Sequence, residues 1–245
     1  MDKIVGGTEA SPHSIPWQVH LSFSVPNAES ITCPPVKHWG RFCGGSIISP
    51  IHILTAAHCL AHPIWTSCED PDNPGPAYET GYYNPEDIVV TAGEHSLSFP
   101  DFAEQKPEVA CVTIHPGWHA YDNSNDIAVL TLKEPIDIDS PLSTAKPVCL
   151  IPDNLERSSI IQAVERASLT VSGWGLMLTP YHTLPDKLQK AEVPYLGIDS
   201  GACYWQNMKD SMLCAGNVAF DQLPDDPDEL RTGACYGDSG GKLSH

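Results

Sequence analysis

Three residue types that together can cleave an acyl bond stand far apart in this chain of 245 residues. Ser239 lies in the stretch Cys-Tyr-Gly-Asp-Ser-Gly-Gly, where the three glycines and one aspartate around it offer no side chain large enough to shield it. Glycines permit close approaches and turns that other residues resist, so the hydroxyl could point outward while main-chain amides converge beside it. Two such amides would stabilise an oxyanion. Alone, the stretch fits a glycine-rich surface turn equally well.

A histidine and an aspartate upstream offer this serine its partners. His58 follows an apolar strand–turn–strand pattern over 42–59, and a histidine in such a place is more often structural than catalytic. Asp126 opens the apolar run Ile127–Leu130, where an aspartate is more often a turn former. If Asp126 is buried, it needs a partner, because burying an unpaired carboxylate is very costly. His58 would be such a partner.

Composition limits the classes of protein and of ligand. The 31 acidic and 13 basic side chains give a net charge of −18, which argues against binding nucleic acid or anionic membrane through bulk electrostatics. No apolar run is long enough to span a bilayer. Nine cysteines suggest an oxidising compartment, and their odd number leaves at least one without an internal partner.

The pattern of short strands and turns predicts an all-β barrel or sandwich. The 23 prolines and 18 glycines favour turn-rich architecture. We expect a loop without regular structure over 61–87, an acidic loop over 221–229 and a connection between two halves over 134–152. Strands are expected at 17–23, 42–59 with one internal turn, 88–92, 109–114, 169–178 and 191–196.

Four motifs in a fixed order make the chain resemble the chymotrypsin/trypsin-like serine proteases from Ile4 to Leu243. They are Ile-Val-Gly-Gly from Ile4, Thr-Ala-Ala-His-Cys around His58, Asn-Asp-Ile-Ala around Asp126, and Gly-Asp-Ser-Gly-Gly around Ser239. The resemblance implies two six-stranded antiparallel barrels of the chymotrypsin type. The implied organisation is a residual propeptide or leader at 1–3, an N-terminal barrel at 4–133, the connection at 134–152, and a C-terminal barrel at 153–245.

The resemblance also implies roles for individual residues in an endopeptidase that cleaves polypeptides through an acyl-enzyme. His58, Asp126 and Ser239 would be the catalytic triad, and the amides of Gly237 and Ser239 the oxyanion hole. Cleavage after Lys3 by an activating protease would free the amine of Ile4 to pair with Asp238. Gly233 would form the floor of the specificity pocket, and an uncharged floor favours apolar or aromatic P1 residues.

Metal and disulfide expectations follow from the same resemblance. No cofactor is required for catalysis. Three carboxylates between residues 94 and 104 could gather a hard cation, although a solvated acidic loop is at least as good an explanation. The resemblance places a structural calcium there, with ligands Glu94, Ser96, Phe99, Asp101 and Glu104. It also implies the bridges Cys43–Cys59 and Cys203–Cys214, while a Cys33–Cys68 bridge is a guess from two insertions. The pairings of Cys111, Cys149 and Cys235 are left open.

The two ends of the chain depart from the family pattern. The sequence stops six residues after Ser239, so we expect a C-terminally truncated protease with an incomplete second barrel. It opens Met-Asp-Lys without a signal peptide, although the resemblance implies secretion. Protein protease inhibitors are expected partners beside the substrates. The rival hypotheses are a catalytically incompetent homologue that acts as a binding protein, and a calcium-dependent binding module.

Overall fold

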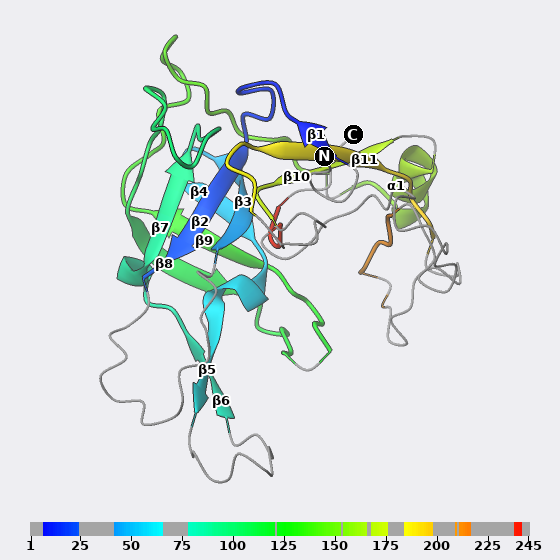
Figure 1. Cartoon of the computed structure of the whole chain (residues 1–245). Helices are drawn as coiled ribbons and strands as arrows, with labels where there is room; N and C mark the ends of the chain where they lie inside the picture. Colours follow the sequence, from blue (N-terminus) through cyan, green and yellow to red (C-terminus); the bar gives the residue numbers. More distant parts are fainter. Residues whose placement is uncertain are drawn as a thin grey trace, which may run out of the picture.

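The structure, a computed structural model, is rich in β-strands (Figure 1). It describes residues 7–24, 42–65, 78–120, 122–152, 154–165, 168–175, 184–197, 209, 211–216 and 238–241. These ranges contain a six-stranded sheet, a three-stranded sheet, a two-stranded hairpin and an α-helix.

The six-stranded antiparallel sheet forms the first half of the molecule. Its strand order is β7-β2-β3-β4-β9-β8. The two edges approach each other through the isolated bridges Val89–Glu108 and Ala92–Gln105, so the sheet curls towards a barrel. The strands are β2 (Gln18–Phe23), β3 (Phe42–Ser49), β4 (His52–Thr55), β7 (Ile88–Ala92), β8 (Val109–Ile114) and β9 (Ala128–Leu132).

Alternating burial along these strands builds the core of this half. Val19 and Leu21 on β2 face inward with Ile47 on β3, Ile53 on β4 and Leu130 on β9, and all five are fully buried. Each such side chain contributes roughly 1.5–3 kcal/mol when it leaves water. The core therefore fixes the strand register, and with it the segments that follow β4 and precede β9.

The second half contains the three-stranded sheet, in the order β1-β11-β10. Its strands are β1 (Thr8–Glu9), β10 (Leu169–Gly173) and β11 (Gln189–Val193), and the helix α1 (Arg157–Val164) precedes β10. Val164 at the end of α1 packs with Leu169 and Val193 in a small core of its own. No described helix has the length and apolar character needed to cross a membrane.

Polar and aromatic contacts join the two halves. The hydroxyl of Ser172 on β10 donates to the side-chain oxygen of Gln18 on β2 at 2.8 Å, and both residues are buried. Trp174, only 1% exposed, donates its indole N–H to the carbonyl of His95 at 3.2 Å. The buried residues Ala10, Ile15 and Leu188 pack around this indole.

The all-β prediction is confirmed, one local expectation is wrong, and one helix was not predicted. The expected loop at 61–87 contains an antiparallel hairpin of β5 (Ala61–Trp65) and β6 (Tyr78–Tyr82), which projects from the six-stranded sheet (Figure 1). The prediction failed because main-chain bonding forms this hairpin without an alternating apolar pattern. The helix α1 was not expected, and it buries only Val164, so it leaves a weak amphipathic signal. Two short 3-10 turns complete the described elements, η1 (Ala57–Leu60) and η2 (Pro85–Asp87).

Candidate active site

His58 is presented to solvent by the 3-10 turn η1, which begins two residues after the end of β4. Its neighbours Ala57, Cys59 and Leu60 are buried in the core, and Cys59 forms a disulfide with Cys43 on β3. The imidazole itself keeps 42% of its surface exposed. A turn anchored on both sides and covalently tied to β3 therefore holds an accessible histidine in one place.

Asp126, two residues before β9, meets His58 through both carboxylate oxygens. Oδ2 lies 2.7 Å from the imidazole Nδ1, and Oδ1 accepts the main-chain amide of His58 at 2.8 Å. Strands β4 and β9 pair from Thr55–Ala128 onward, so the sheet register brings the two residues together across 68 positions of sequence. This two-point contact fixes both the position and the orientation of the ring.

The electrostatics of this pair determine the tautomer of His58. Burial opposes ionisation of Asp126, but hydrogen bonds from the imidazole and the main-chain amide of His58 outweigh it and hold the pKa of Asp126 below its usual range. An ionised carboxylate only accepts hydrogen bonds, so Nδ1 must carry the proton. In the neutral ring, Nε2 is then the nitrogen with the free lone pair, as a general base requires.

Ser239 lies in the turn 238–241, which packs directly on β3 and β4. The Ser239 carbonyl accepts the amide of Gly44 at 2.7 Å. Gly240 has φ +79°, and a Cβ on it would overlap the Thr55 hydroxyl and the Gly44 carbonyl. The Thr55 hydroxyl in turn donates to that carbonyl at 2.9 Å. This contact requires a glycine both for its φ and for its closeness to the sheet.

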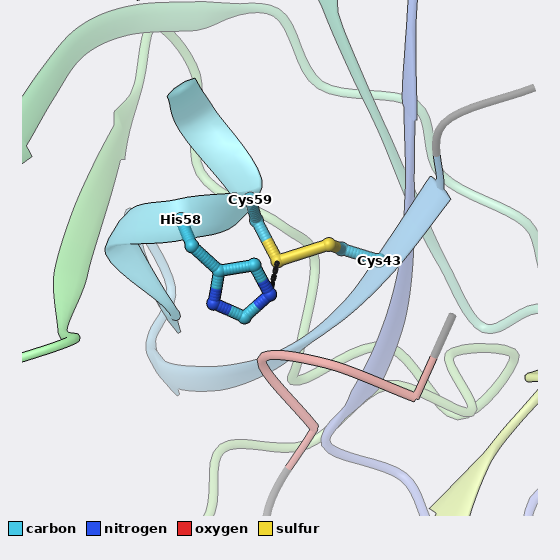
Figure 2. Close-up of side chains that lie close together, drawn as sticks. All are labelled: Cys43, His58 and Cys59. Carbon is cyan, nitrogen blue, oxygen red and sulfur yellow. Dashed lines mark hydrogen bonds between the residues drawn. A yellow bond between two sulfur atoms is a disulfide. The ribbon is translucent and has the colours of Figure 1, made fainter. Parts of the chain in front are cut away.

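The serine turn and the histidine meet at the disulfide. His58 Nε2 lies 3.9 Å from Cys59 Sγ (Figure 2), and the Ser239 carbonyl lies 3.6 Å from the same sulfur. Neither contact shares a proton, because a disulfide sulfur carries none and Nε2 is the unprotonated nitrogen. Among the described residues, no hydrogen bond joins the Ser239 hydroxyl to His58.

The grouping of Cys43, His58 and Cys59 within metal-ligand distance does not make a metal site. Zinc and similar ions bind cysteine as the thiolate. Both sulfurs are instead bonded to each other at 2.09 Å. The grouping records how closely the disulfide packs against the imidazole (Figure 2).

Asp238 is buried, and its carboxylate lies in a cradle formed by the segment after β10. Oδ1 accepts the amide of Gly175 at 2.8 Å. A Cβ on Gly173 or on Gly175 would overlap the carboxylate. The chain therefore places a buried acid immediately beside Ser239, in a space that exists only because both neighbours are glycines.

The three carboxylates of the loop 94–104 that are expected to bind calcium do not all lie within metal-ligand distance of one another, and Asp101 instead pairs with His13 at 3.4 Å. Burial, and next the negative charge of Glu104, raise the pKa of Glu94 to about 7. The Oε1 atom of Glu94 is buried with no hydrogen-bond partner among the described residues. Glu104 accepts the amide of Asp101 at 2.5 Å and pairs with Lys106 at 3.0 Å. Among the features of this loop, the partnerless oxygen of Glu94 is the one that a hard cation would satisfy.

Several residues expected from the sequence lie outside the described ranges. They are Ile4, Cys33, Cys68, Cys203, Gly233, Cys235, Gly237 and the acidic loop 221–229. Cys214 is disulfide-bonded. Cys111 and Cys149 are exposed free thiols. The sequence analysis missed Gly44 and Thr55, although both lie inside the 42–59 pattern that it singled out.

Comparison with known proteins agrees with this geometry. A sequence model of the family described as trypsin matches residues 4–245. The chain therefore belongs to the trypsin family of serine proteases.

Among individual relatives, chymotrypsin-C of Bos taurus is 28% identical over 248 residues, covering 99% of this chain and 72% of that protein. Chymotrypsin-like elastase family member 1 of Canis lupus familiaris is 30% identical over 246 residues, covering 98% of this chain and 75% of that protein. Ovochymase of Halocynthia roretzi is 31% identical over 242 residues, covering 98% of this chain and 12% of that protein.

Proposed function

We propose that this chain is a serine endopeptidase in which His58, Asp126 and Ser239 form the catalytic triad. The observation that carries the proposal is the two-point hydrogen bonding of Asp126 to His58, at 2.7 and 2.8 Å, beside the Ser239 turn. With Nδ1 bonded to Asp126, the Nε2 atom of His58 can accept a proton. This atom faces Cys59, and the Ser239 carbonyl contacts the same residue. Hydrogen bonds in catalytic triads are often loose without substrate, and in this proposal the Ser239 hydroxyl reaches His58 Nε2 when substrate binds.

The chemistry then follows from these roles. Ser239 Oγ attacks the scissile carbonyl while His58 Nε2 accepts the hydroxyl proton, and His58 next protonates the leaving amine. Water repeats the sequence on the acyl-enzyme and regenerates the serine. Asp126 stabilises the imidazolium that forms in both steps. The amides of Ser239 and Gly237 would receive the oxyanion. Proteases of this family act on polypeptides and need no cofactor for this catalysis.

Activation is proposed to depend on Asp238. An activating protease would cut after Lys3, and the new amine of Ile4 would pair with the Asp238 carboxylate. The buried position of Asp238 supports this role, since a buried carboxylate is strongly stabilised by an incoming cation. Asp238 adjoins Ser239, so this pairing would order the oxyanion hole in the same step.

We propose an apolar or aromatic preference for the residue before the cleaved bond. Gly233, six residues before Ser239, leaves the floor of the pocket without a charge. The relatives named chymotrypsin-C and chymotrypsin-like elastase family member 1 support this choice over a preference for lysine or arginine. We place the enzyme outside the cell, where protein protease inhibitors would be further partners.

Calcium is proposed as a structural ligand of the loop 94–104. Glu94, Asp101 and Glu104 would supply carboxylate oxygens, and Ser96 and Phe99 main-chain carbonyls. The partnerless Oε1 of Glu94 supports the proposal. The ion would neutralise neighbouring acids and fix the loop, with no part in the chemical steps.

Labelling of Ser239 with an active-site-directed phosphonate tests the function. The chain is assayed before and after removal of residues 1–3, with phosphonates that carry phenylalanine or lysine at the position of the cleaved residue. We expect labelling after removal, faster with phenylalanine, and none in Ser239→Ala. Hydrolysis of a matching peptide should follow the labelling. A folded chain that neither labels nor hydrolyses would instead indicate the incompetent binding homologue.

A further inference from the structure

The segment 122–126, which leads into β9 and ends on Asp126, is held in an unusual conformation. Asn123 and Asn125 both lie in the left-handed region, with φ of 50° and 53°. L-residues other than glycine rarely adopt this conformation, although asparagine tolerates it best. The side chain of Asn125 also donates to the carbonyl of Gly117 at 2.8 Å. Because Asp126, the last residue of this segment, orients His58, the contacts that hold the segment also affect the position of His58.

The side chain of Asp122 gathers several of the contacts that hold the segment. His119 contributes others, because its amide donates to the Ser124 carbonyl at 3.1 Å and its imidazole lies 3.4 Å from Asp122 Oδ1. Asp122 Oδ1 accepts the amide of Ser124 at 3.0 Å and also the Ser124 hydroxyl. Its Oδ2 accepts the ammonium group of Lys209 at 2.8 Å, and this group contacts the Ser124 hydroxyl as well. Ser124 is 4% exposed, between the two left-handed asparagines. The bond from Lys209, and next those from Ser124, hold the pKa of Asp122 far below its usual range.

Lys209 comes from the second half of the molecule, 87 positions after Asp122. Its side chain is 44% exposed, and the ammonium group reaches across to a segment of the first half. Only Asn125 separates the Ser124 end of this cluster from Asp126. A change in the backbone at Asn125 would rotate Asp126 away from one or both of its contacts with His58.

We propose that Lys209 is a positioning residue for catalysis: by binding Asp122 and Ser124 it holds the segment 122–126 in the conformation that presents the Asp126 carboxylate to His58. Lys209 does not contact His58 or Asp126. It links the second half, which contributes Ser239, to the segment that supplies the triad acid. The expected effect of Lys209 on catalysis rests on the proposed function. Its expected effect on the Asp126–His58 contact depends on the fold alone.

The test substitutes Lys209→Met, which keeps the unbranched side chain up to Cε and removes the ammonium group with its charge. In the activated full chain we expect kcat/KM for a short peptide to fall about ten- to hundred-fold, mainly through kcat, because small misplacements of catalytic groups are costly. Lys209→Arg should restore most of the loss. Lys209→Met combined with Asp122→Asn should cost little more than either change alone, because both break one contact.

The pH profile separates positioning from a simple change of charge. Loss of the aligned carboxylate destabilises the imidazolium, so the acid limb of kcat/KM should move to lower pH in Lys209→Met. Removing a positive charge without any movement of Asp126 would stabilise the imidazolium and move this limb to higher pH. A shift to higher pH would therefore overturn the proposal.

A second measurement does not depend on hydrolysis. The proton between His58 Nδ1 and Asp126 should give a far-downfield NMR resonance in the wild type, and Lys209→Met should broaden or shift it. Lys133→Met is the matched control, because it breaks the exposed Lys133–Glu108 pair of 2.6 Å at the opposite end of β9. An inactive wild type with this resonance changed by Lys209→Met would reject the proposed function alone. A resonance unchanged in Lys209→Met, or changed equally in the control, would reject the role of Lys209.

Discussion

At the scale of single residues, the candidate site depends on glycines that allow direct main-chain contact between the Ser239 turn and the sheet. The turn that carries Ser239 contacts β3 without intervening side chains, since the Ser239 carbonyl bonds to the amide of Gly44. Gly240 completes the contact with a left-handed φ against Gly44 and Thr55. The position of the serine is thus set by backbone geometry, which a single methyl group can disturb.

Gly240→Ala should therefore displace the serine turn. The left-handed φ alone costs roughly 1–2 kcal/mol for a residue with a Cβ, and the overlap with Thr55 and Gly44 adds to that cost. We expect a loss of unfolding free energy in urea, and phosphonate labelling of Ser239 at least tenfold slower.

Gly197→Ala is the matched control for this substitution. Gly197 has nearly the same φ, +74°, but a Cβ there would meet its nearest neighbour, in Tyr195, at 3.9 Å. It should show the backbone cost without the loss of labelling. Equal labelling rates in the two variants would mean that contact with the sheet does not position Ser239.

At the scale of elements, the sequence predicts those strands whose apolar residues alternate or run continuously. The pattern of β3 and β4 is clear because Ile47 and Ile53 face one core. The hairpin β5–β6 is not predicted, because main-chain bonding forms it without an alternating apolar pattern. The helix α1 is not predicted either, because its one buried residue, Val164, gives no apolar helical pattern. Spacing along the chain also cannot pair His58 with Asp126. Their contact depends on the β4–β9 register, and only the family motifs anticipate it.

The loop 94–104 gives a prediction about pH. The pKa of Glu94 rises from its ordinary value of 4.5 to about 7 in the folded chain, through burial and the charge of Glu104. Folded Glu94 thus holds its proton more tightly than the unfolded residue. When a chelator keeps calcium away, Glu94 makes its full contribution to the free energy of unfolding below pH 4.5. This contribution is lost as the pH rises from 4.5 to about 7.

Glu94→Gln should remove that loss and raise the unfolding free energy at pH 7.5 by about 1 kcal/mol, a value reduced for solvent screening. If calcium binds, millimolar calcium should stabilise the wild type increasingly as Glu94 ionises, and should have little effect on Glu94→Gln. Glu108→Gln is the control, since the Lys133 ion pair lowers the pKa of Glu108. It should keep both the pH slope and the calcium response. A calcium response that survives Glu94→Gln would remove Glu94 from the ligand set.

At the scale of the whole molecule, the site exists only where the two halves are held together. His58 and Asp126 lie in segments next to strands β4 and β9 of the six-stranded sheet, while Ser239 lies in the turn 238–241. The Ser172–Gln18 hydrogen bond and the packed indole of Trp174 join the halves beside that meeting point. Gln18 also lies close to Gly44, where a Cβ would meet its Nε2 atom at 3.0 Å. The Ser172–Gln18 contact between the halves therefore lies next to Gly44, on which the Ser239 turn packs.

Removing the hydroxyl of Ser172 tests this coupling. Ser172→Ala leaves the side-chain oxygen of Gln18 buried without its donor, which should lower the unfolding free energy by about 1–3 kcal/mol. Adding Gln18→Leu should recover part of the loss, because no unsatisfied amide oxygen then remains. Ser168→Ala, which removes an exposed hydrogen bond of 2.9 Å to Glu192, should cost less than about 0.5 kcal/mol. Phosphonate labelling should slow in Ser172→Ala and stay unchanged in Ser168→Ala. If Ser172→Ala lowers stability while labelling stays at the wild-type rate, the link between the halves maintains the fold without positioning Ser239.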